Sequence, residues 1–113
     1  IAYRNVKSDD LASELFLDSL RSNSDLGRPR RGSEVTHPLI HTGISVWEHA
    51  DQAIRNAEKF PALGDFVAEL RLDSTSDARY FAWGARPGHL TIWADPQKLR
   101  EATVGTIPVG QRS

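Results

Sequence analysis

Hydrophobic and polar positions alternate in several short segments of the chain, a pattern that predicts strands with one buried face. In the first segment, residues 1–6, the alternation places Ala2, Arg4 and Val6 on one face and Tyr3 on the other, with Ile1 and Asn5 beside it. Further strands are predicted over residues 39–46, 66–72, 79–83, 89–94 and 103–109.

Apolar residues spaced three or four positions apart predict two main helices. The first covers about residues 9–20 and begins after Ser8, with acidic residues at the positive end of the helix dipole. The second covers about residues 47–60, and Pro61 prevents its continuation. Its predicted apolar stripe consists of Ala50, Ala53, Ile54, Ala57 and Phe60. A short third helix is predicted to open at Asp95-Pro96.

The order of these elements predicts one small α+β domain over residues 1–113. We expect a mixed, curved sheet of about five to six strands and two main helices. Only the connection from Ile44 to Phe66 has the pattern of a helical crossover between two strands.

The composition narrows the class of protein. The 113 residues suit a single domain, and the net charge of -1 argues against a surface that binds nucleic acid throughout. The chain has no cysteine, which excludes disulfides and thiolate metal sites, and we expect a cytoplasmic protein. No apolar run approaches the roughly 20 residues that span a bilayer, so no membrane partner is expected. Because residue 1 is Ile1 and methionine is absent, we expect either a processed or trimmed product or a chain that lacks disordered leading residues.

A long loop is predicted over about residues 21–38, where glycine, proline and serine interrupt any apolar periodicity. It carries four arginines: Arg21, Arg28, Arg30 and Arg31. Two interpretations remain open. The loop is either a solvated surface segment or an anion-binding flap for the phosphate groups of a nucleotide or RNA.

Ser45 lies at the predicted junction of a strand and a helix. The segment Ser45-Val46-Trp47-Glu48 matches a capping box, in which the serine caps the helix and Glu48 reaches back. A hydroxyl at this junction also suits a ligand site. Because Trp47 stands where a nucleophile elbow needs its second glycine, a serine hydrolase is disfavoured.

The histidines do not have the spacing of a zinc site. His37 and His41 are four residues apart, but Pro38 between them excludes a shared helical face. His89 follows a glycine and shares a face with Trp93, so it is interpreted either as stacked on Trp93 or as a ligand contact.

Two carboxylates, Glu69 and Glu101, are candidate acids or transition-state stabilisers. By default, Glu69 lies beside Arg71 on a solvated ion-pair face, and Glu101 is simply exposed at the end of the short helix. The aromatic residues are numerous enough either to line one pocket or to form the core of a small domain. They are Tyr3, Trp47, Tyr80, Phe81, Trp83 and Trp93.

These features resemble the ADP-ribosyltransferase-like fold family. The resemblance rests on Tyr3-Arg4 in the first strand, on Gly43-Ile44-Ser45 with Trp47 before a helix, and on the strand 66–72. It is strongest over residues 41–72. The order of glycine, serine, aromatic residue, helix and later Pro-Gly-His is also similar to small uncharacterised bacterial proteins, which implies no function.

The resemblance implies a domain that binds NAD and transfers ADP-ribose to a protein or nucleic acid. Arg4 would pair with the pyrophosphate, and Ser45 would orient Arg4 or the ribose. Trp47 or Tyr80 would stack on the nicotinamide. A late glutamate stabilises the transition state in that family; the Glu-x-Glu and Gln-x-Glu motifs are absent here, so this role would fall to Glu101. His89 is the remaining candidate for contact with the cofactor.

Two other functions stay open. The first is a non-catalytic protein-binding module that keeps only the fold, such as an immunity protein, an antitoxin-like partner or a regulatory domain. The second is a nucleotide- or RNA-binding protein that uses Arg28, Arg30 and Arg31.

Overall fold

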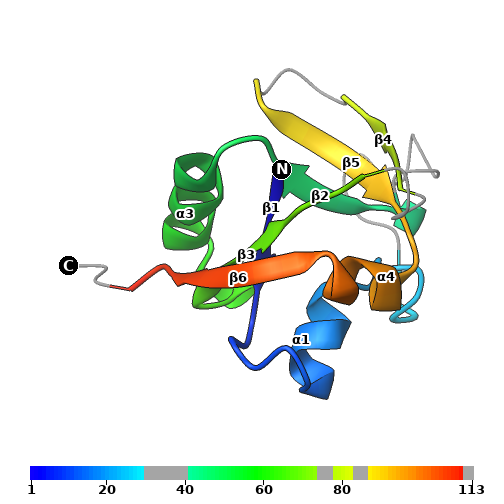
Figure 1. Ribbon diagram of the computed structural model, residues 1–113, viewed down its shortest axis with the longest axis horizontal. Helices are drawn as coiled ribbons and strands as arrows, with labels where there is room; N and C mark the ends of the chain where they lie inside the picture. The colour runs from blue at the N-terminus through cyan, green and yellow to red at the C-terminus, as the bar shows by residue number, and fades with distance from the viewer. Residues whose placement is uncertain (30–40, 74–77, 83–86, 111–113) are drawn as a thin grey trace.

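Six strands form one antiparallel sheet in the order β4-β5-β2-β1-β3-β6 in the computed structural model, which describes residues 1–29, 41–73, 78–82 and 87–110 (Figure 1). The strands are β1 (Ala2–Val6), β2 (Ile44–Trp47), β3 (Phe66–Leu70), β4 (Arg79–Phe81), β5 (His89–Trp93) and β6 (Thr103–Pro108). The helices of the described residues are α1 (Glu14–Ser19), α3 (Ala50–Lys59) and α4 (Pro96–Glu101), with a 3₁₀ turn η2 (Pro61–Leu63) after α3.

The predicted α+β class and the number of strands are confirmed, and the crossover from β2 through α3 to β3 is present. Every pair of neighbouring strands is antiparallel, so the prediction of a mixed sheet with parallel and antiparallel pairs is wrong. The reason is that β1 lies between β2 and β3 and runs antiparallel to both. The crossover therefore joins two strands of the same direction without placing them side by side.

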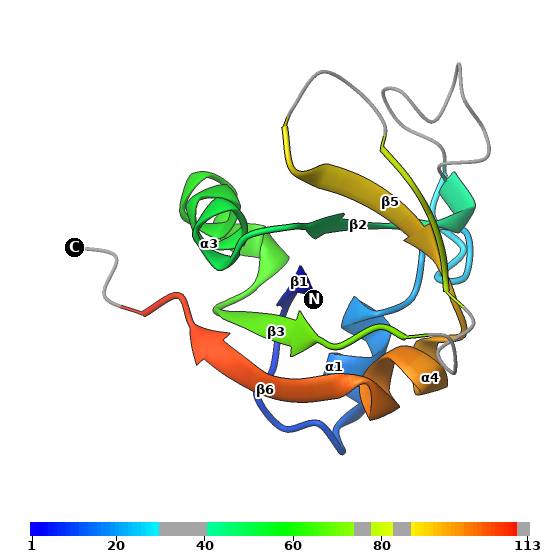
Figure 2. The same cartoon turned by 45° about the horizontal axis from the view of Figure 1, so that its top comes forward.

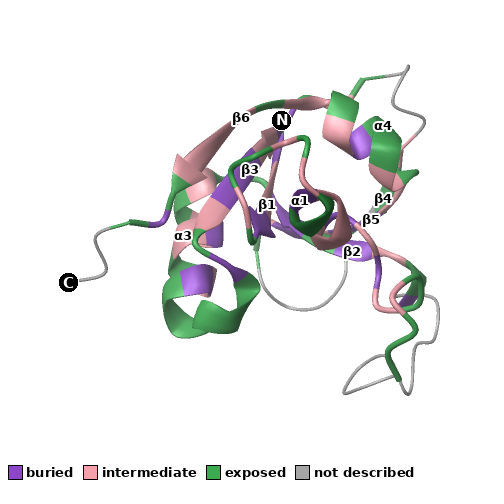
Figure 3. Cartoon of the chain, turned by 90° about the horizontal axis from the view of Figure 1, so that it is seen from below, coloured by how far each residue is buried: buried purple, intermediate pink, exposed green. Residues whose placement is uncertain are grey.

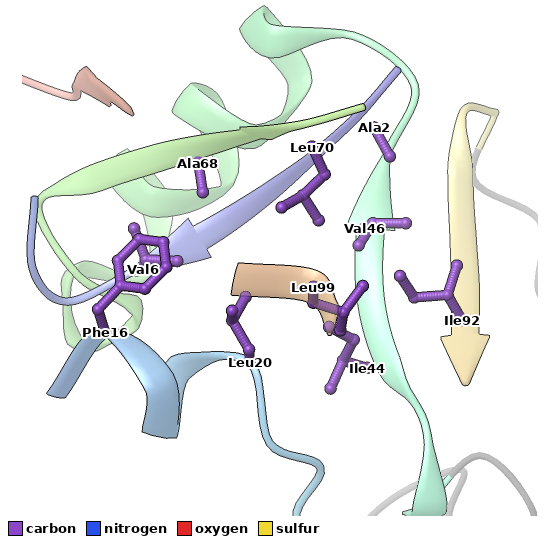
Figure 4. Close-up of a cluster of buried hydrophobic side chains, with 10 residues drawn as sticks. All are labelled: Ala2, Val6, Phe16, Leu20, Ile44, Val46, Ala68, Leu70, Ile92 and Leu99. Atoms are coloured by element: carbon purple, nitrogen blue, oxygen red, sulfur yellow. The ribbon is translucent and has the colours of Figure 1, made fainter. Parts of the chain in front are cut away.

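The helices cover the two faces of the sheet separately, with α1 and α4 together on one side and α3 on the other (Figure 2). The core under α1 and α4 joins residues from most elements (Figure 4). Its buried members are Ala2, Val6, Phe16, Leu20, Ile44, Val46, Ala68, Leu70, Ile92 and Leu99. The core under α3 consists of Trp47, Ala53, Ala57, Val67 and Val109, and Tyr3 packs against it. The alternation predicted for β1 is therefore confirmed.

The first helix begins later than the sequence pattern indicates. Its N-cap is Ser13, whose hydroxyl accepts a hydrogen bond from the backbone N–H of Phe16 at 3.1 Å. The serine and aspartates upstream form local turns instead: Asp10 accepts from the N–H of Ala12, and Ser8 accepts from the N–H of Asp10. Asp and Ser side chains compete with helix formation through such local hydrogen bonds.

Replacing Ser13 by alanine is expected to lower the free energy of unfolding by about 1 kcal/mol, because the cap bond to α1 is lost. The matched replacement at Ser8, the start expected from the sequence, removes the bonds that Ser8 accepts from the Asp10 N–H and the Ser13 hydroxyl but leaves the cap bond, so its effect should be smaller. Urea unfolding of both variants measures the difference. Equal losses would contradict the assignment of Ser13 as the cap.

The second helix also begins later than predicted. Strand pairing continues through Trp47, which lies opposite Tyr3 on one side and His89 on the other. The backbone N–H of Glu48 then donates to the carbonyl of Gly88, and α3 starts at Ala50 with His49 as its N-cap. The capping box predicted from Ser45 is therefore wrong, since Ser45 lies inside β2. The buried stripe of Ala53 and Ala57 agrees with the prediction, and the outer side of α3 is exposed (Figure 3).

Candidate functional site

Arg4 bridges the first strand, the first helix and the second strand. Its Nε donates to the carbonyl oxygen of Ser19 at 2.9 Å, and its Nη1 donates to the carbonyl oxygen of Ser45 at 2.9 Å. Ser19 ends α1, where carbonyls lack partners within the helix. A guanidinium is a suitable partner for them because its planar group holds several N–H donors in a fixed geometry.

Near Arg4, the pairing between β1 and β2 is shorter than the pairing between β1 and β3. Strands β1 and β2 share a single register pair, Tyr3 with Trp47, whereas β1 and β3 pair along their whole length. Beyond that pair, the carbonyl of Ser45 is bonded by the side chain of Arg4. The guanidinium thus lies where the two strands part, and its bond to Ser45 is exposed to solvent.

The guanidinium of Arg4 has no carboxylate partner among the described residues, and only two of its N–H groups are used by the bonds above. Burial, followed by the positive charge of nearby Arg28, lowers the pKa of Arg4 to about 10. Arg4 is still charged at neutral pH. A half-buried cation beside a second cation is a site that an anion would stabilise.

Arg28 is the described arginine of the predicted arginine loop that reaches this site. It is exposed, its backbone N–H donates to the carbonyl of Asn23 at 2.8 Å, and its side chain donates to Asn23 Oδ1 at 3.2 Å. Arg21 from the same stretch is instead paired with Asp18 and Glu14. Arg30, Arg31 and the remainder of the loop from residue 32 lie outside the described residues.

Ser45 contacts Arg4 through its backbone carbonyl and not through its side chain. Ile44 and Val46 face the core under α1, so alternation directs the exposed side chain of Ser45 to the opposite face. The orienting role that the sequence suggested for the Ser45 hydroxyl is therefore performed by its carbonyl. This distinction was invisible in the sequence, because it depends on where β1 and β2 separate.

The other candidate residues lie further apart in the fold. Glu101 is exposed at the last turn of α4, and it forms no hydrogen bond or ion pair with Arg4 or Ser45. Trp47 is buried under α3, on the face opposite to Arg4. Tyr80 is 73% exposed on the short edge strand β4. Arg4 and Ser45 are thus the two candidates that the structure joins directly.

His89 is buried on β5, directly opposite Trp47. The two rings meet edge to face with centroids 5.0 Å apart. The stacking of His89 on Trp93 expected from the sequence is therefore replaced by a cross-strand contact with Trp47. Trp83 and His37 lie outside the described residues.

Sequence reasoning missed a polar pair on the α3 face. Tyr3 and Glu69 are opposite each other on β1 and β3, and the Tyr3 hydroxyl donates to Glu69 Oε1 at 3.3 Å. Burial, followed by the charge of Glu69 and this hydrogen bond, raises the pKa of Tyr3. Glu69 was expected beside Arg71 on a solvated face, and its cross-strand partner emerges only from the register of the sheet.

A separate open cavity of about 330 Å³ lies between α1 and the start of α4, lined by Leu17, Arg21, Asp25, Asp95, Pro96 and Gln97. Neither Arg4 nor Ser45 lines it. Within the described part of the chain, no three histidine or acidic side chains gather as metal ligands would. The described helices are also too short or too polar to cross a bilayer.

Comparison with protein-family models, with curated proteins and with solved structures finds no match to this chain.

Proposed function

We propose that this protein is a small ADP-ribosyltransferase-like domain that binds NAD through its pyrophosphate at Arg4. The observation that supports the proposal is the guanidinium of Arg4, held by two backbone carbonyls, without a described carboxylate partner and close to Arg28. The same residue carries the family resemblance in the sequence. A cytoplasmic location, expected from the absence of cysteine, remains part of this proposal.

The chemistry of the site favours a phosphate ligand. A guanidinium whose plane is fixed by two hydrogen bonds presents its remaining N–H groups as a fork that matches two phosphate oxygens. Arg28 adds a second positive charge nearby, so a pyrophosphate would relieve the repulsion between the two cations. Ser45 holds Arg4 by its carbonyl, whereas its exposed hydroxyl lies on the opposite face of the sheet, so we assign Ser45 the role of orienting Arg4 rather than the ribose.

Transfer of ADP-ribose breaks the glycosidic bond between the ribose carbon and nicotinamide, and nicotinamide leaves with the bonding electrons. The acceptor nucleophile forms the new bond to that carbon and releases a proton. A carboxylate beside the sugar stabilises the positive charge that develops during this step. We assign this role to Glu101, as the resemblance implies.

A thermal-shift titration with NAD tests the binding step. At about 100 times its Kd, a ligand stabilises the folded state by about 2.7 kcal/mol, which gives a clear rise in Tm for a domain of this size. We expect this rise with the wild-type chain and its loss in Arg4→Lys. Lysine keeps the charge but lacks the planar fork that bonds two carbonyls and a phosphate together.

Two further variants separate the possible contributions. Ser45→Ala should leave both the Tm without ligand and the shift with NAD unchanged, because Arg4 bonds the backbone of Ser45 and the hydroxyl lies on the opposite face of the sheet. Glu101→Gln should bind NAD normally and release nicotinamide more slowly. An equal shift by NAD in the wild type and in Arg4→Lys would overturn the assignment of Arg4.

The second candidate is a protein-binding module that keeps the fold only. The observation in its favour is a run of four consecutive exposed apolar residues, Phe60 to Leu63, after α3. Phe60, predicted on the buried stripe of the helix, is 50% exposed, and the ammonium of Lys59 lies 5.8 Å from its ring centroid. If no nucleotide shifts the Tm of the wild type, a partner pull-down that compares Phe60→Ser with the wild type tests this function.

A further inference from the structure

We propose a second binding surface, for single-stranded nucleic acid, on the part of the sheet that α3 leaves uncovered. The α3 helix has its main contacts with β1, β3 and β2. Beyond them, the same face continues over β2, β5 and β4 towards Ser45, Trp93 and Arg79, which we call the open face. This surface is distinct from the site at Arg4 and does not depend on the proposed function.

The indole of Trp93 lies close to Gly43 and Thr42, which precede β2. A Cβ placed on Gly43 would stand 3.0 Å from Trp93 Cε2, so the ring covers this glycine directly. The ring is also oriented by its own N–H, which donates to Thr42 Oγ1 at 3.0 Å. Trp93 is half-buried, so the residue keeps some surface that a ligand can reach. A fixed and partly accessible indole is suited to stack on a nucleobase.

Arg79 supplies the charge of the open face. It is the register partner of Trp93 on β4, and residues directly opposite on antiparallel strands share a face. No carboxylate pairs with Arg79 among the residues that the structure describes. Ser45 adds an exposed hydroxyl, placed on the same face by its pairing with Thr91. An indole, a guanidinium and a hydroxyl together match a base, a phosphate and a ribose.

The charge of the described open-face positions favours a nucleic acid as the ligand. The described positions Gly43, Ser45, Arg79, Thr91 and Trp93 carry one positive charge and no negative charge. A polyanion is therefore favoured over a basic or apolar partner for the open face. Because only one phosphate contact is provided, we expect weak binding with a shallow dependence on salt.

The test measures the fluorescence anisotropy of a fluorescein-labelled oligouridylate of about ten nucleotides at low salt. Wild type is expected to bind, and Trp93→Leu to bind roughly 10-fold more weakly, because a stacked base is lost. Trp93→Phe keeps a ring and should retain most of the affinity. Arg79→Gln should reduce the slope of log affinity against log salt by roughly 0.7, since one phosphate contact is removed.

The matched control is Tyr80→Ala, which removes a neighbouring exposed aromatic ring. Strand alternation places Tyr80 on the opposite face of β4, so its replacement should leave the affinity unchanged. If circular dichroism shows that Trp93→Leu is unfolded, the proposal is tested by the slope of log affinity against log salt for Arg79→Gln. No binding by the wild type, tighter binding of a duplex, or an unchanged slope in Arg79→Gln would overturn the proposal.

Discussion

Gly64→Ala is expected to lower the free energy of unfolding by about 3 kcal/mol or more, because two separate effects act at this position. Gly64 follows η2 with a φ of 123°, a conformation that residues with a Cβ rarely adopt. A Cβ there would also stand 2.1 Å from the carbonyl oxygen of Val6 and 2.6 Å from its carbonyl carbon. Both atoms belong to the backbone of β1, so the contact is relieved only by moving the strand.

The measurement is urea unfolding followed by circular dichroism. Gly105→Ala is the matched control, since the space around a Cβ at that position of β6 is open and the backbone is not in the left-handed region. We expect its stability to stay within about 0.5 kcal/mol of the wild type. If Gly64→Ala were as stable as Gly105→Ala, the close packing of Gly64 on β1 would be wrong.

Phe16→Ala is expected to cost about 3 to 5 kcal/mol, as is usual when a buried aromatic side chain is truncated. Phe16 is fully buried in the core between α1 and the sheet, where its ring reaches towards β1 (Figure 4). The helix α1 has six residues, too few to be stable without tertiary contacts. Losing Phe16 should therefore loosen α1 as well as reduce the global stability.

Leu15→Ala is the control for this experiment because Leu15 precedes Phe16 in the same helix but is 50% exposed. Alanine and leucine are both good helix formers, so we expect a change within about 0.5 kcal/mol. Hydrogen exchange of the α1 amides distinguishes local from global effects. Comparable losses of stability in the two variants would contradict the direction in which α1 faces the sheet.

Arg4 connects these stability arguments with the proposed function. Its guanidinium bonds the end of α1 through Ser19, so a variant at Arg4 alters the docking of the helix as well as the anion site. For this reason the NAD titration compares Tm shifts rather than Tm values. The Tm without ligand reports the loss of the two carbonyl bonds, and the shift reports ligand binding.

The sequence was sufficient to predict the elements whose signal is local. Alternation in 1–6 and 66–72, the apolar stripe of Ala53 and Ala57, and the stop at Pro61 each depend on residues a few positions apart. The cap and proline at Asp95-Pro96 were predicted for the same reason, and Asp95 does accept from the N–H of Gln97. These features establish an α+β domain without information on which strands pair.

Tertiary structure decided the helix starts. Ser45 and Ser8 both precede apolar runs with helical spacing, and each has the local pattern of a cap. The strand pairs of Trp47 with Tyr3 and His89 extend β2 past Ser45, and turn hydrogen bonds occupy Ser8. A cap signal competes with cross-strand hydrogen bonds, and the sequence does not contain the position of the partner strand.

The candidate site likewise has features that the sequence predicted and features that only the structure shows. The family resemblance identified Arg4 as a candidate from the sequence. Only the structure shows that Arg4 bonds two carbonyls and has no carboxylate partner among the described residues, at the place where β1 and β2 separate. The pairing of Tyr3 with Glu69, and of Arg79 with Trp93, depends on register alone. The sequence by itself thus determined which residues alternate and where the chain turns. Only the tertiary structure decided which side chains meet, because strand order and register are set by contacts between segments far apart in the chain.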